Sequence, residues 1–495
     1  MSETPALTLR QYTIADHKAV MEVHRLGLLQ MGWDGASGPW DADLEHIEDY
    51  YLRHGEFLVG TCDGRVVAIG GLRVLPSGVG ELKRMRIHAD YYGRRYDQIL
   101  LEALTVRARE LGATRLVLEV DERRVPAQEL YARNGFIRQG TLLVGRTPSI
   151  VFEKELLATR PDDLDALLLE TITAAKIAGL AVAWSHGGVP VELRIVGADI
   201  HGASLSSEAL FPTASLSKLA VALGVLRLVD QGVLSLDAPI HEILPDAVVA
   251  DGVTLRGLLC HTAGLPELPL VVEGSWSEIG LSCQTTPGDQ APGTRVAYSN
   301  HGYGLLGLAL ERVTNQSFGD ALTSLVFKPL GLDAHVADAL PRAPVQGWRF
   351  RVLPAGGVFM SVAAALTLIE TFNHSRSRFV SPALLEMATQ DQTGGVAGGM
   401  GPRLQWTRCP WGLGPEIRGD RYSPWIPRSA GAASFGHAGA SGCVAWADPE
   451  ANVSWAILTV PPTDRATGVR WHLQSRPNLA DIGEAILTTC QSRIP

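Results

Sequence analysis

Lysine is scarce in this chain of 495 residues, which holds only six lysines among its 43 basic side chains. Long apolar runs are missing too: the longest nearly apolar stretches, residues 174–184 and 358–369, are shorter than the roughly 18 residues of a membrane-spanning helix. Nor is there a basic excess, since the net charge is −9 and nucleic-acid-binding domains are usually basic. We therefore expect a globular protein with a small-molecule substrate, without a nucleic-acid or membrane partner, and leave its oligomeric state open.

Cysteines are few and scattered, and no C-x-x-C pair occurs. This spacing matches neither a zinc cluster nor a disulfide framework, so we expect no metal site and mostly buried, reduced thiols. The first residues show no basic segment followed by an apolar one, which is the pattern of a secretory signal. From these observations we expect a cytoplasmic protein. The cysteines are Cys62, Cys260, Cys283, Cys409, Cys443 and Cys490.

The composition suits more than one domain. Apolar residues make up 46% of the chain and charged residues 19%, as in globular proteins, and one domain usually takes roughly 100–200 residues. The clearest candidate domain boundary is residues 156–163, which follow a strand-like run. Within it, Pro161 and the two aspartates after it start a helical pattern. We expect a first domain over residues 1–157 and a second over residues 158–495.

In the first domain, short strands alternate with helices, which predicts an α/β domain with its own mixed sheet. Two of the strands flank the turn Asp63-Gly64, a strong hairpin pattern. The expected strands are 56–62, 65–72, 81–88 and 116–120, and the expected helices are 98–111 and 127–134.

In the second domain, strand patterns lie at both ends of the sequence, with a long helix over residues 215–231 and much loop between them. This order predicts an α+β domain whose antiparallel sheet is built from both ends and flanked by the inserted helices. The expected strands are 179–185, 191–197, 442–447 and 454–460.

The segment Ser215-Leu216-Ser217-Lys218 lies at the start of that long helix, where one turn places Ser215 and Lys218 on the same face. Backbone N–H groups at a helix N-terminus favour developing negative charge. The apolar residues after Lys218 are expected to desolvate its ammonium, which would make the amine a base for the hydroxyl. The alternative is an N-cap serine beside a solvated lysine.

Two further motifs follow along the chain, Tyr298-Ser299-Asn300 and His437-Ala438-Gly439. An H-x-G triplet alone carries little information, because His186-Gly187-Gly188 also fits it. In the order S-x-x-K, Y-x-N and H-x-G, however, the three motifs resemble the serine β-lactamase and penicillin-recognising family, in particular its class C and esterase branch. Further landmarks extend the resemblance along the second domain: residues 258–266, 292–310, 329–332, 354–357 and 411–414.

The resemblance implies that Ser215 is the acylated nucleophile. Lys218 and Tyr298 would move its proton, with Tyr298 as the base and its phenol pKa lowered beside the ammonium. The backbone N–H groups of Ser215 and Ala440 would form the oxyanion hole, where each such donor typically contributes about 3–4 kcal/mol.

The resemblance further implies that Asn300 holds the polar group on the acyl side of the substrate. His437, followed by Gly439, would line the opposite wall, where many relatives have lysine. His261, within residues 258–266, is expected to be a structural turn residue. Trp276 is expected either to shape the pocket or to belong to the core.

After the Y-x-N motif we identify no E-x-x-N segment that would match class A deacylation by a glutamate-bound water, so hydrolysis of the acyl-enzyme would depend on Tyr298 and Lys218. The acyl group would pass to water or to an alcohol or amine, and the sequence leaves hydrolase and transacylase open. The serine site needs no cofactor. The fold itself does not identify the substrate.

Residues 81–136 resemble motifs A and B of the GNAT N-acetyltransferases. The strand-and-loop part is residues 83–94, KRMRIHADYYGR, and the second part is residues 125–136, VPAQELYARNGF. The resemblance implies an acetyl-CoA or other acyl-CoA donor, with Glu81 as general base through water and Tyr131 as the acid that protonates the departing thiolate.

The cofactor loop of this first domain departs from the family pattern Q/R-x-x-G-x-G/A, since residues 92–97 read YGRRYD. Arg95 adds bulk where the backbone approaches the phosphates, and Asp97 adds a repelling carboxylate. Gly93, Arg94 and Arg95 remain the candidate cofactor-binding residues. Two hypotheses stand: competent acyl transfer through a modified loop, or a scaffold that recruits substrate without acetyl transfer.

We therefore expect a cytoplasmic serine acyl-enzyme hydrolase or transacylase, acting on an ester or amide of a small metabolite, fused to a GNAT-like domain. Natural-product biosynthesis or resistance is a plausible setting for such a fusion. An alternative is a non-catalytic sensor in which both folds bind ligands. A third hypothesis has the first domain acylate a metabolite and the second remove or move that group.

Overall fold

The structure is a computed structural model of the chain. It describes residues 7–30, 32, 41–75, 78–144, 147–156, 164–175, 177–266, 276–336, 353–401, 404–460 and 476–492. The chain divides into two compact units: unit 1 is residues 1–140 with 149–160, and unit 2 is residues 141–148 with 161–495. The expected domain boundary at 157/158 and the expected helix start at Pro161 lie outside the described residues.

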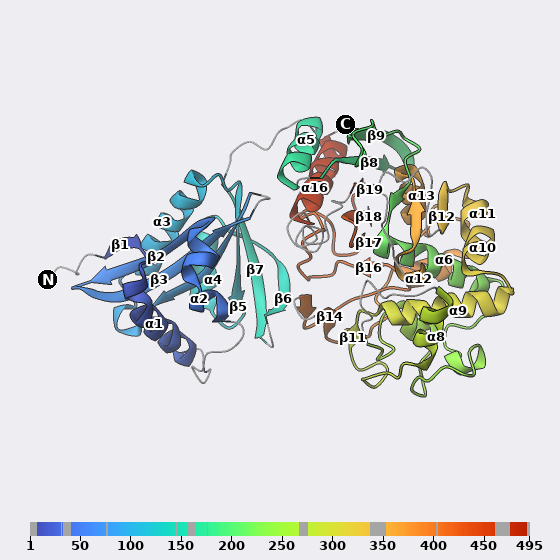
Figure 1. The fold of residues 1–495 in the computed structure, drawn as a ribbon, viewed down its shortest axis with the longest axis horizontal. Helices are drawn as coiled ribbons and strands as arrows, with labels where there is room; N and C mark the ends of the chain where they lie inside the picture. The colour runs from blue at the N-terminus through green and yellow to red at the C-terminus, as the bar shows by residue number, and fades with distance from the viewer. Residues whose placement is uncertain are drawn as a thin grey trace. The chain divides into compact units, whose positions relative to one another are not determined.

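Unit 1 is built around a mixed sheet with the strand order β1-β2-β3-β4-β5-β7-β6 (Figure 1). Strands β1 to β4 are antiparallel, β5 is parallel to β4, and β7 is antiparallel to β5. The mixed sheet expected from the sequence is thus confirmed. The strands are β1 Thr8–Gln11, β2 Gly55–Cys62, β3 Arg65–Val74, β4 Val79–Ile87, β5 Arg115–Asp121, β6 Ile137–Val144 and β7 Thr147–Glu155.

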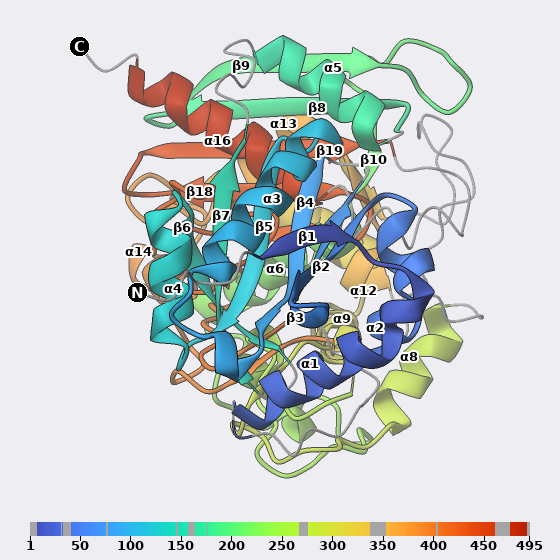
Figure 2. The ribbon, with the colours of Figure 1, turned by 90° about the vertical axis from the view of Figure 1, so that its left-hand side faces the viewer.

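Helices cover both faces of this sheet, and α1 and α3 lie on opposite sides of the strands in Figure 1. On β3, Ile69 packs in the apolar cluster that includes α1 and α2, whereas Ala68 and Leu72 pack in the cluster of α3. This alternation follows from the two-residue period of a strand. Figure 2 shows α2 beside α1. The helices are α1 His17–Gln30, α2 Ala42–Glu45, α3 Tyr96–Glu110 and α4 Val125–Arg133.

The hairpin between β2 and β3 forms as expected. Asp63 and Gly64 both have positive φ, 50° and 78°, which is the backbone that a two-residue type I′ turn requires. The parallel pair β4–β5 extends only from Val79 opposite Arg115 to Leu82 opposite Leu118. Beyond it the two strands continue without pairing to each other.

Unit 2 contains a six-stranded antiparallel sheet in the order β16-β17-β18-β19-β8-β9. Because β8 and β9 come from the start of the unit and β17 to β19 from its end, the expected sheet built from both ends is confirmed. Its strands are β8 Gly179–His186, β9 Val189–Gly197, β16 Glu416–Ile417, β17 Phe435–Gly439, β18 Cys443–Asp448 and β19 Val453–Thr459.

Two apolar cores lie on the two faces of this sheet. On β8, Leu180, Val182 and Trp184 pack in the cluster with α16, whereas Ala181 and Ala183 pack in the cluster with α6, α9 and α13. Small side chains on the second face let these helices approach the sheet closely. Figure 1 shows α5 beside α16, apart from α13. The longer helices are α5 Leu164–Ala175, α6 Ser217–Asp230, α8 Trp276–Thr285, α9 Asn300–Thr314, α13 Val362–Glu370 and α16 Arg476–Ser492.

Short elements complete unit 2. The short helices are α7 Leu255–Leu259, α10 Phe318–Leu322, α11 Lys328–Leu330, α12 Leu353–Gly356 and α14 Pro382–Ala388. The short strands are β10 Phe211–Pro212, β11 Val296–Ala297, β12 Ala334–Val336, β13 Val358–Met360, β14 Gly398–Met400 and β15 Leu404–Trp406. All six cysteines are buried free thiols.

Candidate active sites

Ser215 lies in a tight turn rather than in the first turn of an α-helix. The long helix, expected from residue 215, begins at Ser217, and residues 214–216 form a 3-10 turn before it. Ala214 has a φ of +47°, a left-handed conformation that costs a non-glycine residue about 1–2 kcal/mol. Such strain is common where a side chain must be presented in one orientation.

Neighbouring hydroxyls hold this turn against β13. Ser217 Oγ accepts the backbone N–H of Val358 at 3.0 Å, and Thr213 Oγ1 donates to the carbonyl of Val358 at 2.7 Å. All three residues are buried. The backbone around Ser215 is therefore anchored on both sides, and Ser215 itself is 5% exposed.

Lys218 is completely buried, so the expected desolvation of its ammonium is confirmed. Its Nζ lies 3.2 Å from Ser215 Oγ, 2.8 Å from Asn300 Oδ1 and 2.9 Å from the carbonyl oxygen of Ala355. An ammonium has three protons, and each has an acceptor. These contacts fix the amine beside Ser215 Oγ.

Tyr298 contacts the same oxygen atom. Its hydroxyl donates to Ser215 Oγ at 2.8 Å, and Lys218 Nζ lies 4.8 Å from the centre of its ring. Asn300, the first residue of α9, is held in place because Ser299 caps the helix by accepting the N–H of Gly302 at 3.0 Å. The S-x-x-K and Y-x-N motifs thus meet around one oxygen atom.

The H-x-G motif forms the end of β17. A side chain at Gly439 would place its Cβ 2.3 Å from the carbonyl oxygen of Thr213, so only glycine lets this strand approach the nucleophile turn. Ala440 follows directly, with 9% of its surface exposed. His437 is buried, and its Nδ1 donates to the carbonyl of Ala438 at 2.8 Å, since a carbonyl can only accept.

Three participants in this site were not named as site residues from the sequence. The Ala355 carbonyl holds Lys218. Trp411 has its ring centre 5.8 Å from that of Tyr298 and 5.7 Å from that of His437. The ring centre of Tyr303 lies 5.4 Å from Lys218 Nζ. All three lie in the landmarks 292–310, 354–357 and 411–414, where the sequence assigned them no role.

Trp276, expected either at the pocket or in the core, packs as a core residue. Its Nε1 donates to Glu311 of α9 at 3.2 Å, and its ring lies 6.2 Å from that of Phe318. It is also packed against the large core of unit 2.

In unit 1, Glu81 and Tyr131 lie on separate elements, and no hydrogen bond between them is found among the described residues. Glu81, on β4, faces Arg73 across the hairpin, with Oε2 3.7 Å from Nη1. Tyr131, on α4, is buried against Phe136 and Phe152. Burial raises the pKa of Tyr131, an effect that the nearby guanidinium groups oppose, so its phenol stays protonated at neutral pH as an acid requires.

The loop over residues 92–97 holds the candidate cofactor-binding residues Gly93, Arg94 and Arg95. Arg95 takes a left-handed conformation with φ +62°, directly before α3. Asp97 Oδ1 accepts the N–H of Gln98 at 2.9 Å, so a carboxylate already occupies one backbone donor at this helix start. A Cβ added at Gly93 would have no heavy atom within 4 Å. The guanidinium carbon of Arg94 lies 5.1 Å from the ring centre of Tyr91.

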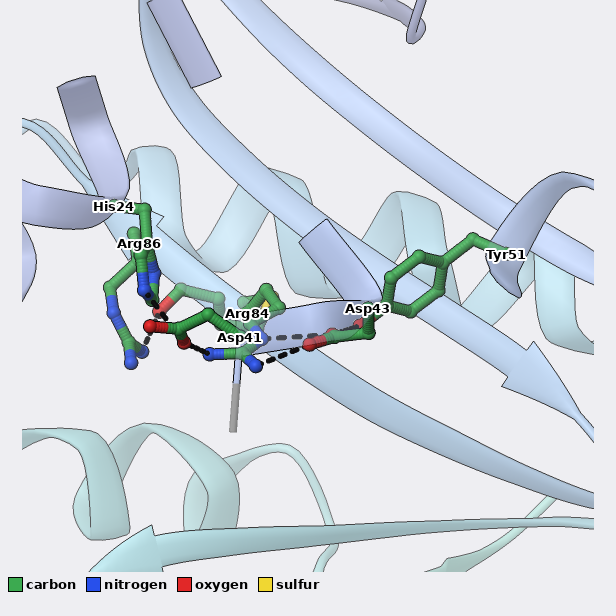
Figure 3. A network of polar contacts seen from close by, with 7 residues as sticks. His24, Asp41, Asp43, Tyr51, Arg84 and Arg86 are labelled. Atoms are coloured by element: carbon green, nitrogen blue, oxygen red, sulfur yellow. Dashed lines mark hydrogen bonds and ion pairs between the residues drawn. The ribbon is translucent and has the colours of Figure 1, made fainter. Parts of the chain in front are cut away.

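A buried polar network in unit 1 ties β4 to α1 and α2 (Figure 3). Arg84, at a positive φ of 58° within β4, bonds Asp41 Oδ1 at 2.9 Å and contacts Asp43 with both Nε and Nη2. His24 Nε2 lies 3.1 Å from Asp41, and the Tyr51 hydroxyl donates to Asp43. The pairing with Arg84 outweighs the effect of burial and lowers the pKa of Asp43.

Within the described parts of the chain, no cluster of three or more His, Cys, Asp or Glu side chains is arranged to hold a metal ion. A search of the same residues for bilayer-crossing segments turns up no helix of sufficient length and apolarity.

Comparison with known families matches both units. The model of the family described as Beta-lactamase matches residues 164–473, and the model of the Acetyltransferase (GNAT) family matches residues 26–136. Unit 1 thus contains a GNAT domain and unit 2 a β-lactamase-like serine hydrolase domain, as the motifs predict.

Individual proteins are similar to parts of unit 2. A penicillin-binding protein 4 of Amycolatopsis lactamdurans is 34% identical over 160 residues, 30% of this chain and 41% of that protein. The esterase EstB of Burkholderia gladioli is 34% identical over 194 residues, 34% of this chain and 49% of that protein. The match therefore spans less than half the length of these relatives. A β-lactamase structure from Mycobacterium bovis aligns with a TM-score of 0.50 at 25% identity, covering 65% of this chain and 99% of that one.

Proposed function

The chain belongs to the beta-lactamase family, and on that premise we propose that unit 2 forms an acyl-enzyme on Ser215 from an ester or amide of a small metabolite. The acyl group then passes to water, or to an alcohol or amine. The observation that carries this proposal is the convergence of the Tyr298 hydroxyl and the Lys218 ammonium on Ser215 Oγ, at 2.8 and 3.2 Å. The names of two relatives, a penicillin-binding protein and an esterase, support esters and amides as the substrate class.

Acylation begins as Ser215 Oγ forms a bond to the substrate carbonyl carbon and its proton moves to Tyr298. For this step Tyr298 has first released its own proton to solvent, and the nearby ammonium of Lys218 stabilises the phenolate that accepts the proton of Ser215. The oxyanion that develops accepts hydrogen bonds from the backbone N–H groups of Ser215 and Ala440. As the bond from the carbonyl carbon to the leaving oxygen or nitrogen breaks, the proton passes from Tyr298 to that atom.

Deacylation repeats these steps with the acceptor in place of the leaving group. Water, an alcohol or an amine gives its proton to Tyr298 and attacks the acyl carbon. The bond to Ser215 Oγ breaks, and Oγ recovers a proton. Asn300 holds the polar group of the acyl side during both steps, and His437 lines the opposite wall.

For unit 1 we favour a ligand-binding or substrate-recruiting role without acetyl transfer through the usual loop. The carboxylate of Asp97 at the start of α3 and the left-handed Arg95 support this choice. The competing hypothesis is acetyl transfer with Glu81 as base and Tyr131 as acid, and the raised pKa of Tyr131 supports it.

The test is the intact mass of the protein after exposure to p-nitrophenyl acetate, with Ser215→Ala as the matched variant. We expect an acetyl adduct or p-nitrophenol release from the wild type, reduced by at least about 10⁴-fold in the variant. If neither protein reacts with this ester or with a panel of other acyl donors, the catalytic proposal fails. A sensor that binds ligands through both folds is then the better account.

A further inference from the structure

His261 lies beside the candidate active site in a conformation that its turn alone does not explain. It follows α7 in a tight turn, is 2% exposed and has a φ of +60°. A left-handed backbone costs a histidine about 1–2 kcal/mol relative to glycine. A turn by itself would be better served by glycine or asparagine, so the imidazole has another reason to be present.

Its hydrogen bonds hold the chain on both sides of Tyr298. The carbonyl oxygen of His261 accepts the N–H of Ala297 at 2.9 Å. Its ring Nδ1 accepts the N–H of Ser299 at 3.1 Å. The residues before and after Tyr298 are thus fixed by one side chain and its own backbone.

The imidazole also packs against the phenol itself. The ring centres of His261 and Tyr298 are 4.6 Å apart, with Trp411 at 4.8 Å and Tyr303 at 5.2 Å from the imidazole. Tyr298 therefore has an aromatic wall on the side of His261 and Trp411. Its hydroxyl is left directed at Ser215 Oγ, 2.8 Å away.

The protonation state of His261 agrees with this arrangement. A backbone N–H can only donate, so Nδ1 must keep its lone pair and the ring proton lies on Nε2. Burial, followed by the charges of Lys218 and His437, holds the pKa of His261 well below its usual value. The ring stays neutral, which keeps the bond to Ser299 and adds no second cation beside Lys218.

We propose that His261 is a positioning residue for acylation, which aims the Tyr298 hydroxyl at Ser215 through its bonds to Ala297 and Ser299 and its ring contact. This inference rests on the proposed function of unit 2. His261 acts through Tyr298 and not on the substrate, so its loss should slow the chemical step more than it weakens substrate binding.

The test compares His261→Gly and His261→Asn in the full chain. Glycine accepts the positive φ without strain but provides neither the acceptor nor the ring. Asparagine also tolerates this backbone, and its Oδ1 can accept the N–H of Ser299 in place of Nδ1. Because neither variant strains the turn, folding is expected to persist, and thermal unfolding is measured for both.

Single-turnover release of p-nitrophenol from p-nitrophenyl acetate gives the acylation rate constant and the apparent ester Kd. We expect His261→Gly to lower the rate constant by about 10²-fold with less than a threefold change in Kd, because small misplacements of a reacting group have effects of this size. His261→Asn should recover about tenfold of the loss. The buried His301, which bonds the Cys283 carbonyl, supplies the control: His301→Asn should lower the melting temperature and leave acylation unchanged.

Several outcomes overturn the inference. It fails if His261→Gly is acylated at the wild-type rate, if the whole loss lies in ester Kd, or if asparagine recovers nothing. In these cases the proposed function of unit 2 still stands, because the wild type is acylated on Ser215. A wild type that is not acylated removes the proposed function, and this inference with it.

Discussion

One cation from each unit shows two ways of holding a positive charge. Lys218 in unit 2 is bonded to the neutral oxygens of Ser215, Asn300 and Ala355. Arg84 in unit 1 is paired with two carboxylates, those of Asp41 and Asp43. A charge held by neutral groups still acts on neighbouring protons, whereas one neutralised by carboxylates serves to bind elements together. Lys218 is thus part of the candidate active site, whereas Arg84 contributes to the packing of unit 1.

The same contrast holds for the residues that the motifs name. In unit 2 the Lys218 ammonium and the Tyr298 hydroxyl both lie within 3.2 Å of Ser215 Oγ. In the described part of unit 1, Glu81 forms an ion pair with Arg73. Tyr131 packs against the rings of Phe136 and Phe152. The motif matches thus indicate the fold of both units. Only in unit 2 do the described residues that the motifs name also lie together around one atom.

The largest expected effect is on Lys218. Lys218→Met keeps the length of the side chain but removes the ammonium, so proton transfer at Ser215 loses its electrostatic support. We expect ester turnover to fall by about 10³-fold or more and the melting temperature to fall, because Asn300 and Ala355 lose a buried partner. The exposed Lys328→Met is the matched control. Turnover within tenfold of the wild type would remove the contrast between the two cations.

The second-largest loss of activity is expected for Gly439→Ala, because its Cβ would lie 2.3 Å from the Thr213 carbonyl oxygen. Moving β17 away would displace the N–H of Ala440, and losing one oxyanion donor lowers a rate by about 10²- to 10³-fold. Acylation kinetics measure this effect. Gly224→Ala in α6 is the control, because its nearest neighbours would be 3.6 Å away; it should keep full activity. An unchanged Gly439→Ala enzyme would show that Ala440 does not serve the oxyanion.

A pH dependence should appear in unit 1. Burial, followed by Arg84 and Arg86, lowers the pKa of His24 to about 4, below its unfolded value of about 6.5. The folded state therefore binds fewer protons than the unfolded state. The contribution of neutral His24 to the free energy of unfolding is complete above pH 6.5 and is lost as the pH falls toward 4. The full effect is about 3 kcal/mol.

Hydrogen exchange of peptides from α1 and β4, corrected for intrinsic rates, measures this loss between pH 7 and pH 4.5. His24→Asn should flatten the dependence, and the exposed His46→Asn should not. Equal protection at both pH values in the wild type would contradict the neutral, buried state of His24.

The smallest effect concerns Asp97. If its carboxylate repels the phosphates of acetyl-CoA, Asp97→Asn should tighten binding by about fivefold, which corresponds to roughly 1 kcal/mol between exposed charges. Calorimetry measures the change, with Glu102→Gln further along α3 as the control. Tight binding by the wild type, unaltered in Asp97→Asn, would show that the loop fits the cofactor after all and would weaken the contrast between the units.

Much of the fold could be predicted from the sequence. The type I′ hairpin at Asp63-Gly64 follows from local backbone chemistry, and the strands β8, β18 and β19 follow from apolar runs. The helix start at Ser217 rather than at residue 215 could not be predicted, because the strained turn at Ala214 depends on bonds from Thr213 and Ser217 to Val358, about 140 residues away in the chain.

The sequence by itself indicated which side chains could react, since Ser215, Lys218 and Tyr298 lie in motifs whose order resembles that of a known family. Only the tertiary structure decided how they are held. His261, Trp411 and the carbonyl of Ala355 reach the site from distant segments, and contacts of this kind depend on chain direction and burial rather than on local pattern. The same reason separates the two units: a motif specifies residue types, whereas reactivity depends on what surrounds them in a site of low dielectric.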